Sequence, residues 1–245
     1  KNGIVNNINI SNFSTGIHFR FSNFSYAVNF TVSNSSTGVS VENSFNNSIS
    51  NFSLVGIGGI SRGINLGNGI GNNNFYNFKV NGFGLDGILL SSTVSDHLFV
   101  NGNLSLNGDS ISAGVGSINN VLINVSYEGG EGAMVGDLFR KWYYGAKVNF
   151  TDGENVAGAN VSLFNASQVF SGNSTSDSSG DTGLIVYTDY ENAAGTVFYY
   201  GNYTVYADNV TCFYNESKNL TGGNFLNEVI TLSNNDPEIQ DLDSL

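Results

Sequence analysis

The chain has 245 residues, of which only 11% are charged, and its formal net charge is −12. This acidic balance excludes nucleic acids and anionic membrane surfaces as partners, because both are bound through Lys and Arg. The 18 Phe and 12 Tyr argue against a disordered chain, and the 31 Gly and 39 Asn are not typical of helices.

The N-terminal residues Lys1-Asn2-Gly3 lead directly into patterned sequence, without an initiator Met or a signal peptide. No run approaches the ~20 apolar residues that a membrane-spanning helix needs. We therefore expect a mature or partial chain without a transmembrane segment, and any membrane anchor would lie outside it.

Residues 4 to 127 are periodic. A Gly followed by an apolar-x-apolar triplet recurs at spacings of 22, 25 and 24 residues, beginning at Gly16, Gly38, Gly63 and Gly87. A second element recurs between these triplets, at Asn7–Ile10, Asn29–Val32, Asn47–Ser50, Asn74–Asn77, His97–Val100 and Asn120–Ile123. A repeat of this length indicates a solenoid.

Leucine-rich repeats and the parallel β-helix both have repeats of this length. Leu is sparse and no helical period is present, so the pattern favours a β-helix of about five to six coils. Gly and Asn suit corners with positive φ, and Asn side chains aligned on successive coils are expected to bond in ladders. Like residues should stack, which predicts one internal column containing Ile8, Ile49, Phe75, Leu98 and Val121.

The repeat begins at residue 4 without a polar or helical cap, although solenoid ends normally carry one. This leaves two alternatives: further coils precede residue 1, or the open end pairs with another subunit. The second alternative predicts filaments joined end to end by strand pairing.

The pattern changes after Tyr127, which divides the chain into 1–127 β-helix, 128–141 connector, 142–233 antiparallel β-sandwich and 234–245 acidic tail or linker. Asp137–Lys141 is expected to form a short helical turn. The readable strands of the sandwich are Tyr143–Phe150, Ala159–Phe164, Gly183–Tyr187, Tyr203–Tyr206 and Glu228–Leu232.

Two resemblances add to this interpretation. Residues 148–163, followed by Asp177-Ser178-Ser179-Gly180, resemble the opening strands of carboxypeptidase-regulatory-like, immunoglobulin-like sandwich modules, with Ala157 in place of the usual Pro. The first half resembles right-handed parallel β-helices of the pectate-lyase-like superfamily. The combination is similar to archaeal secreted or cell-envelope proteins, which implies scaffolding or adhesion.

The superfamily resemblance makes polysaccharide cleavage the first enzymatic hypothesis. Glycosidases need paired carboxylates, and Asp86 and Asp96, with His97 adjacent, are the candidates in the solenoid. The multiple-Asp and Gly-His-Gly motifs of hydrolase relatives are missing, and no basic residue lies beside clustered acids in the sequence. We therefore interpret Asp86 as a turn residue bonded to its own backbone, and predict no catalytic residues and no enzyme.

A metal or cofactor is not expected, with one weak exception. Asp177, Ser179 and Asp181 place oxygen ligands at alternate positions, as calcium loops do. An ordinary Asp/Ser turn explains the same pattern. The two His and the single Cys212 are too far apart in the sequence for a zinc site, and Cys212 is interpreted as a small buried residue.

The most pronounced compositional feature is the glycan acceptor motif Asn-x-Ser/Thr. The chain has 17 such motifs, whereas about 7 would arise by chance from its Asn, Ser and Thr content. They begin at Asn9, Asn12, Asn23, Asn29, Asn34, Asn46, Asn51, Asn103, Asn124, Asn149, Asn160, Asn165, Asn173, Asn202, Asn209, Asn215 and Asn219. Strand patterning that favours Asn, Phe and Ser together accounts for part of the excess.

Together these features predict an extracellular, glycosylated, non-enzymatic structural or adhesive protein that self-associates into a fibre or surface assembly. The alternative is a carbohydrate-binding module or a β-helix enzyme acting on surface glycans. The tyrosines of the second region are expected to lie mainly in its core, with sugar or partner binding as their other role. They are Tyr143, Tyr144, Tyr199, Tyr200, Tyr203 and Tyr206.

Overall fold

The structure is a computed structural model that describes residues 3–67, 70–210 and 212–234. All regular secondary structure in these residues is β-strand. The chain forms two compact units: a solenoid unit, Lys1–Arg140 with Glu191–Phe198, and a C-terminal unit, Lys141–Tyr190 with Tyr199–Leu245. Most of the predicted tail, residues 235–245, lies outside the described residues.

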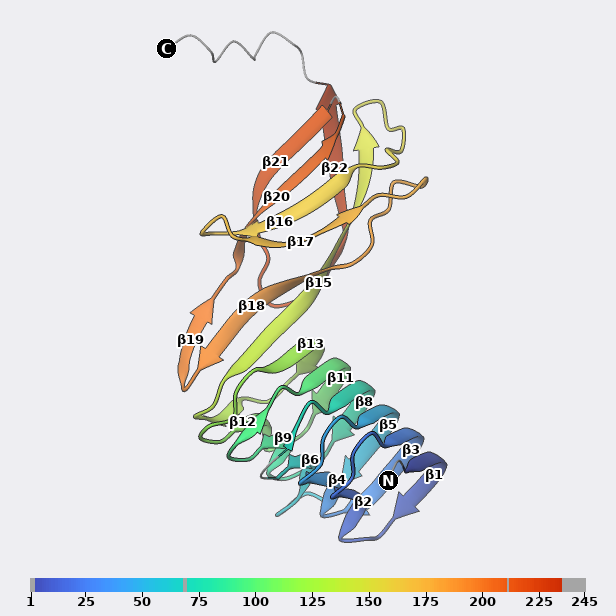
Figure 1. Cartoon of the computed structure of the whole chain (residues 1–245), viewed down its shortest axis with the longest axis vertical. Helices are drawn as coiled ribbons and strands as arrows, with labels where there is room; N and C mark the ends of the chain where they lie inside the picture. Colours follow the sequence, from blue (N-terminus) through green and yellow to red (C-terminus); the bar gives the residue numbers. More distant parts are fainter. Residues whose placement is uncertain (1–2, 68–69, 211, 235–245) are drawn as a thin grey trace. The chain divides into compact units, whose positions relative to one another are not determined.

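The solenoid has about six turns, and its strands pair in parallel with the equivalent strand one coil away (Figure 1). The first sheet contains β1 (Ile4–Ser11), β3 (Tyr26–Ser35), β5 (Ser48–Gly56), β8 (Asn74–Asn81), β11 (Leu98–Ser105) and β13 (Asn120–Tyr127). The second contains β2 (Thr15–Arg20), β4 (Thr37–Glu42), β6 (Arg62–Leu66), β9 (Asp86–Leu90), β12 (Asp109–Ala113) and β14 (Glu131–Met134), and β7 (Ile70–Gly71) pairs with β10 (Val94–Ser95). The all-β class and the parallel solenoid are therefore confirmed.

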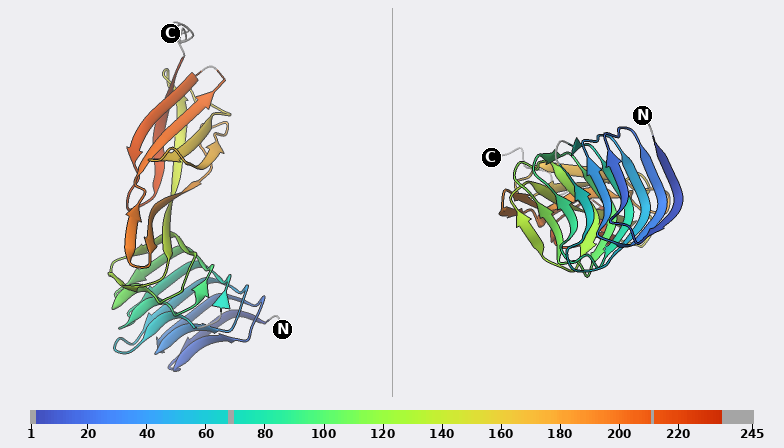
Figure 2. Two further views of the ribbon diagram at one scale, coloured as in Figure 1. Left: turned by 60° about the vertical axis from the view of Figure 1, so that its left-hand side comes forward. Right: turned by 90° about the horizontal axis from the view of Figure 1, so that it is seen from below.

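The Gly-led triplets stack as predicted. Ile17, Val39, Ile64, Ile88 and Ile111 are consecutive partners across the second sheet, and all are buried. These apolar side chains form one wall of a continuous core, which the stacked coils enclose (Figure 2).

The predicted column from Ile8 to Val121 is wrong, because it mixes residues of two core columns with Leu98 and Val121, which belong to neither column. Ile8 stacks on Phe30, Phe52 and Phe78, whereas Ile49 stacks on Phe75, Phe99 and Leu122. Leu98 and Val121 pair with each other but are only half-buried. An error of one residue in register moves a side chain to the other face of a sheet.

An asparagine with positive φ in each strand of the first sheet separates these two columns. Asn7, Asn29, Asn51, Asn77, Asn101 and Asn124 have φ between 52° and 56°. Asn tolerates this left-handed conformation better than other non-Gly residues. The bend interrupts the strand alternation, so that core side chains lie three residues apart, as at Ala27 and Phe30.

A buried polar ladder follows another corner of the coils. Ser25, Asn47, Asn73, His97 and Asn120 are all at most 2% exposed. From Asn47 to Asn120, each side chain accepts the backbone N–H of the preceding member, at 2.9 to 3.2 Å. These bonds satisfy corner amides that the strand ladders leave unpaired, as buried backbone groups require.

In the C-terminal unit, β17 (Phe170–Thr175), β16 (Asn160–Asn165), β20 (Asn202–Asn209) and β21 (Cys212–Asn219) form an antiparallel sheet in that order. At its edge, β21 pairs antiparallel with β22 (Phe225–Asn234), which pairs in parallel with β15 (Leu138–Phe150). β15 also pairs with β18 (Ile185–Ala193), which pairs with β19 (Thr196–Tyr199). The unit has its own core, which includes Trp142, Tyr144 and Tyr203.

The region predicted as a connector is more regular than expected. β14 lies within residues 128–141 and pairs in parallel with β12, so it continues the second sheet of the solenoid. The predicted helical turn at Asp137–Lys141 is wrong, because β15 begins at Leu138.

Candidate functional site

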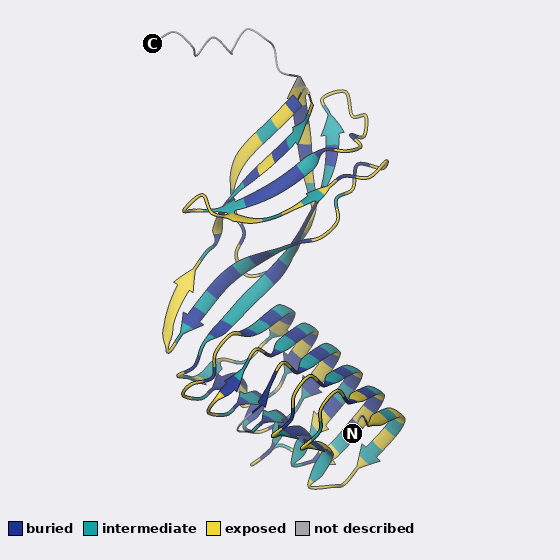
Figure 3. Ribbon diagram, viewed as in Figure 1, coloured by how far each residue is buried: buried dark blue, intermediate teal, exposed yellow. Residues whose placement is uncertain are grey.

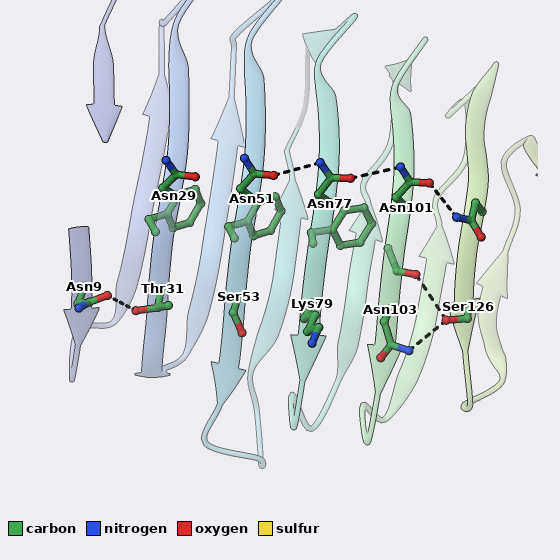
Figure 4. A pocket seen from close by; sticks show the side chains of 15 residues that line it. Asn9, Asn29, Thr31, Asn51, Ser53, Asn77, Lys79, Asn101, Asn103 and Ser126 are labelled. Atoms are coloured by element: carbon green, nitrogen blue, oxygen red, sulfur yellow. Dashed lines mark hydrogen bonds between the residues drawn. The ribbon is translucent and has the colours of Figure 1, made fainter. Parts of the chain in front are cut away.

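A groove of about 840 Å³ runs across the strands of the first solenoid sheet (Figure 4). Its lining repeats from coil to coil, with amides and hydroxyls along its sides and Phe rings below them. The lining consists of Asn9, Asn29, Phe30, Thr31, Asn51, Phe52, Ser53, Asn77, Phe78, Lys79, Asn101, Gly102, Asn103, Asn124 and Ser126.

One side of the groove is the predicted asparagine ladder. Asn77, Asn101 and Asn124 each donate an Nδ2–H to the Oδ1 of the preceding asparagine, at 3.0, 3.2 and 2.8 Å, beginning with Asn51 as acceptor (Figure 4). An amide has two donor hydrogens and two acceptor lone pairs. Each interior member therefore keeps one N–H and one lone pair for a ligand, repeated once per coil of ~4.8 Å.

The second row lies two residues further along each strand. Thr31 donates to Asn9 Oδ1, and Asn103 donates to Ser126 Oγ at 3.0 Å. Lys79 lies between these pairs and is the only charged side chain among the described residues of the lining. The groove is therefore neutral to basic, although the whole chain is acidic.

Stacked aromatic rings of the solenoid core lie beneath the groove, where they are only 2 to 4% exposed. The rings of Phe30 and Phe52 lie 5.1 Å apart, and those of Phe52 and Phe78 lie 5.5 Å apart. The column continues at Gly102, where a Cβ would lie 2.2 Å from Phe78 Cζ. Offset or stacked rings at these separations are favourable and make the base of the groove rigid.

The sequence interpretation did not identify this groove. The bend asparagines from Asn29 to Asn124 follow one another at spacings of 22, 26, 24 and 23 residues. Only when they are aligned do Asn77 and Asn101 become apparent as lining residues, together with Lys79, two residues after Asn77. The lining contains neither a carboxylate nor a thiol, and its accessible side chains are amides, hydroxyls and one amine, so its chemistry is hydrogen bonding. It suits a hydroxyl-rich ligand.

The two carboxylates proposed as a catalytic pair have separate structural roles. Asp86 lies on β9, where its Oδ1 accepts the Ser112 hydroxyl at 2.6 Å and its Oδ2 lies 3.1 Å from Arg62 Nε. The interpretation of Asp86 as a turn residue bonded to its own backbone is therefore wrong. Asp96 lies at a corner with φ of 59° and accepts the Asn119 side-chain amide.

His97 belongs to the buried ladder. Its Nδ1 lies 3.1 Å from the Asn73 backbone nitrogen and 3.3 Å from the Asn73 carbonyl oxygen. Nε2 is buried and has no hydrogen-bond partner among the described residues. Burial lowers the His97 pKa from 6.5 to about 4, against smaller opposing effects of Asn73 and Asp96. The ring is thus held neutral as a structural acceptor. The other histidine, His18, is exposed on β2.

The candidate calcium residues form a closed turn. Asp177 Oδ1 accepts from the Ser179 amide and hydroxyl, both at 2.8 Å, and from the Asp181 amide at 3.1 Å. These bonds to Ser179 and Asp181 lower the Asp177 pKa. Lys147 donates to the Ser179 carbonyl. The alternation of oxygen-bearing residues is accounted for by the turn. Across the described residues there is no group of three or more His, Cys, Asp or Glu side chains placed to hold a metal ion.

The acceptor asparagines are all accessible. Of the 17, 12 are exposed and 5 are intermediate, whereas the buried asparagines Asn47, Asn73, Asn120 and Asn192 do not begin an acceptor motif. Nine of the acceptor asparagines lie in the solenoid, and six of these have positive φ, so the backbone conformation itself favours Asn at those positions. The six are Asn12, Asn29, Asn34, Asn46, Asn51 and Asn124. None of the eight in the C-terminal unit has a positive φ.

Two further predictions concern the C-terminal unit. Tyr144 and Tyr203 are core residues, as expected, whereas Tyr199 and Tyr206 are exposed. Cys212 is buried, as expected.

Neither a protein-family model nor a curated protein sequence matches this chain. Among the residues that the structure describes, no helix is long and apolar enough to span a membrane.

Proposed function

We propose that this protein is an exported, glycosylated, non-enzymatic structural or adhesive component of a cell surface, of the archaeal type. In this proposal the C-terminal unit is an immunoglobulin-like, carboxypeptidase-regulatory-like module, and the solenoid is a right-handed parallel β-helix. The solenoid provides a stiff rod, and the glycans cover strands that would otherwise be exposed.

The accessibility of the acceptor asparagines carries the proposal. Every motif asparagine is at least partly exposed, whereas each fully buried asparagine lacks the motif. A glycan is too large to be buried in a packed core, so selection for glycosylation would produce this division. The eight motifs of the C-terminal unit weigh most, because positive φ does not account for them.

The arrangement of carboxylates supports a non-enzymatic role. A glycosidase needs one carboxylic acid and one carboxylate across a shared cleft. Asp86 is instead engaged by Arg62 and Ser112 within a sheet, and the groove lining lacks an acid.

Self-association by strand pairing is the assembly part of the proposal. β1 pairs with β3 along one edge, and the described residues supply no strand for its other edge. Either a preceding coil or a strand edge at another end of a second subunit would satisfy those backbone groups, and the second case is a heterologous contact that builds a fibre. Electron microscopy of native material should show fibres or arrays, and monodisperse single particles would contradict this part.

Intact-mass measurement of the native protein, before and after deglycosylation, tests the main proposal. We expect loss of several glycan masses, with occupied sites in both units. A mass equal to that of the bare polypeptide would contradict the proposal. Reducing-sugar release from surface polysaccharides that is abolished by Asp86→Asn would show the protein to be an enzyme.

A second candidate function, binding of a linear polysaccharide, is favoured by the groove. Its amide pairs repeat once per coil, and a sugar chain lying along the groove would meet a new pair at each step. Ser53→Tyr would place a ring in the groove and should abolish binding on a glycan array, whereas Ser50→Tyr, on the same strand but outside the lining, should not. Equal binding by both variants would exclude the groove.

A further inference from the structure

The exposed face of the C-terminal antiparallel sheet carries two glycan acceptor asparagines and one tyrosine in the same row. Strand pairing places Ser162 of β16 opposite Asn173 of β17 on one side and opposite Tyr206 of β20 on the other. Tyr206 in turn lies opposite Asn215 of β21. These four side chains form one row across the sheet.

Alternation places this row on the side away from the core. The neighbours of Tyr206 along β20, Val205 and Ala207, are fully buried in the core of the unit. Tyr206 is 36% exposed, and Asn215 is exposed on β21. Most of β21 is exposed (Figure 3). The tyrosine ring is therefore held on the surface by the sheet.

A hollow of about 400 Å³ lies at this place, lined by Tyr206, Asp208, Asn209, Val210, Cys212, Phe213 and Asn215. Phe213, 47% exposed, lies two residues before Asn215 on the same strand and therefore on the same face. Two aromatic rings thus flank an accessible acceptor asparagine.

We propose that Tyr206 is the stacking platform for the first sugars of an N-glycan on Asn215. This inference rests on the proposed glycosylation of the chain. The Cβ atoms of directly opposed cross-strand residues lie ~4.5–5.5 Å apart. A sugar attached to Asn215 Nδ2 therefore reaches the Tyr206 ring without crossing another strand. Its C–H face contacts the electron-rich ring face, while its hydroxyl groups remain in water.

The same row contains a matched control. Asn173 is also exposed and also begins an acceptor motif, but its partner across the strands is the small, buried Ser162. A glycan on Asn173 has no directly opposed aromatic ring. We therefore expect the glycan on Asn215, and not the glycan on Asn173, to stabilise the folded unit.

A double-mutant cycle on the full chain, produced in a glycosylating host, tests this inference. Peptide-level mass spectrometry first establishes occupancy at Asn215 and Asn173. Urea unfolding is then measured for the natural chain, Asn215→Gln, Tyr206→Thr and the double variant. We expect Asn215→Gln to lower the folding equilibrium constant about fivefold when Tyr206 is present and to leave it unchanged in the Tyr206→Thr background. Asn173→Gln should have the same effect in both backgrounds.

An NMR measurement on the natural glycoprotein complements the cycle and requires no variant to fold. Protons of the sugar attached to Asn215 should be shifted upfield by the Tyr206 ring, relative to those of the sugar on Asn173. Equal shifts at the two sites, or an equal loss from Asn215→Gln in both backgrounds, would overturn the inference.

Glycan occupancy at Asn215 and at the other acceptor sites separates this inference from the proposed function. If other sites carry glycans but Asn215 does not, the inference fails and the proposed function stands. If no site carries a glycan, both fail. Concentration-dependent dimerisation abolished by Tyr206→Thr would show that a second copy covers this face, which would also overturn the inference.

Discussion

The backbone amide of Asn73 donates a hydrogen bond to Nδ1 of His97 on the next coil, across 3.1 Å. The histidine takes the place that an asparagine holds at positions 47, 73 and 120 of the buried ladder. The ladder thus depends on a neutral imidazole at this step.

His97 should make the stability of the solenoid depend on pH. Its pKa is about 4 in the folded chain and about 6.5 in the unfolded chain, so between these values the unfolded state binds the extra proton. The stability is fully present above pH 6.5, falls as the pH decreases and levels off below pH 4, with a total loss of about 3 kcal/mol. Urea unfolding at a series of pH values measures this loss.

Variants at the two histidines isolate the effect. His97→Asn should abolish this part of the pH dependence, because an amide fills the same ladder position at Asn73 and Asn120. His18 is exposed, and His18→Asn should preserve the dependence. An unchanged pH profile in His97→Asn would contradict the assignment.

Gly102 is required by the aromatic column beneath the groove. A Cβ at this position would lie 2.2 Å from Phe78 Cζ, so Gly102→Ala should lower the free energy of unfolding by about 2 kcal/mol through overpacking. Phe78→Leu in the same chain should recover part of this loss. Gly130→Ala is the control, because a Cβ there meets nothing within 4 Å. Equal effects of the two alanine variants in thermal unfolding would exclude the steric explanation.

The Arg62–Asp86 pair should stabilise the second solenoid sheet. Asp86 is 7% exposed, so Arg62→Met leaves a buried carboxylate without its cation and should cost about 2 kcal/mol, less than a fully buried pair because Arg62 is partly exposed. Asp86→Asn should cost less, since the amide oxygen still accepts the Ser112 hydroxyl. The reverse order of the two variants in urea unfolding would argue against this account.

Calcium should not stabilise the C-terminal unit. The Asp177 carboxylate already accepts three hydrogen bonds within its turn, and Lys147 Nζ lies 4.0 Å from the Asp181 carboxylate. Melting temperatures measured with calcium and with a chelator should coincide. Asp177→Ala should lower the melting temperature modestly by removing the turn bonds, whereas Ser178→Ala should not. A clear increase in melting temperature with calcium would restore the metal hypothesis.

Local periodicity was sufficient to predict much of the first half of the chain. The recurring Gly-apolar-x-apolar triplets predicted a parallel solenoid, and Ile17 stacks on Val39 and Ile64 as expected. A ladder of aligned asparagines at the corners of the coils was predicted for the same reason: each coil repeats one local conformational requirement, positive φ at a bend, which Asn meets at low cost.

Register and partner choice depended on the tertiary structure. The bend asparagines interrupt the alternation, so a period of two could not assign Phe30 and Ile49 to separate columns. Asp86 looked like a turn residue because its partners, Arg62 and Ser112, are 24 and 26 residues away in the sequence. In the second half of the chain the strands predicted from the sequence were found, but β17, β19 and β21 were missed.

The sequence by itself determined the all-β class, the coil repeat and the positions of the acceptor asparagines, because these follow from composition and from short-range conformational preference. Only the tertiary structure decided which polar side chains line a groove, which lie buried in a ladder, and which acceptor faces a tyrosine. The physical reason is that strand pairing joins residues more than twenty positions apart, or on separate hairpin arms, and hydrogen-bond and packing energies act on that spatial proximity.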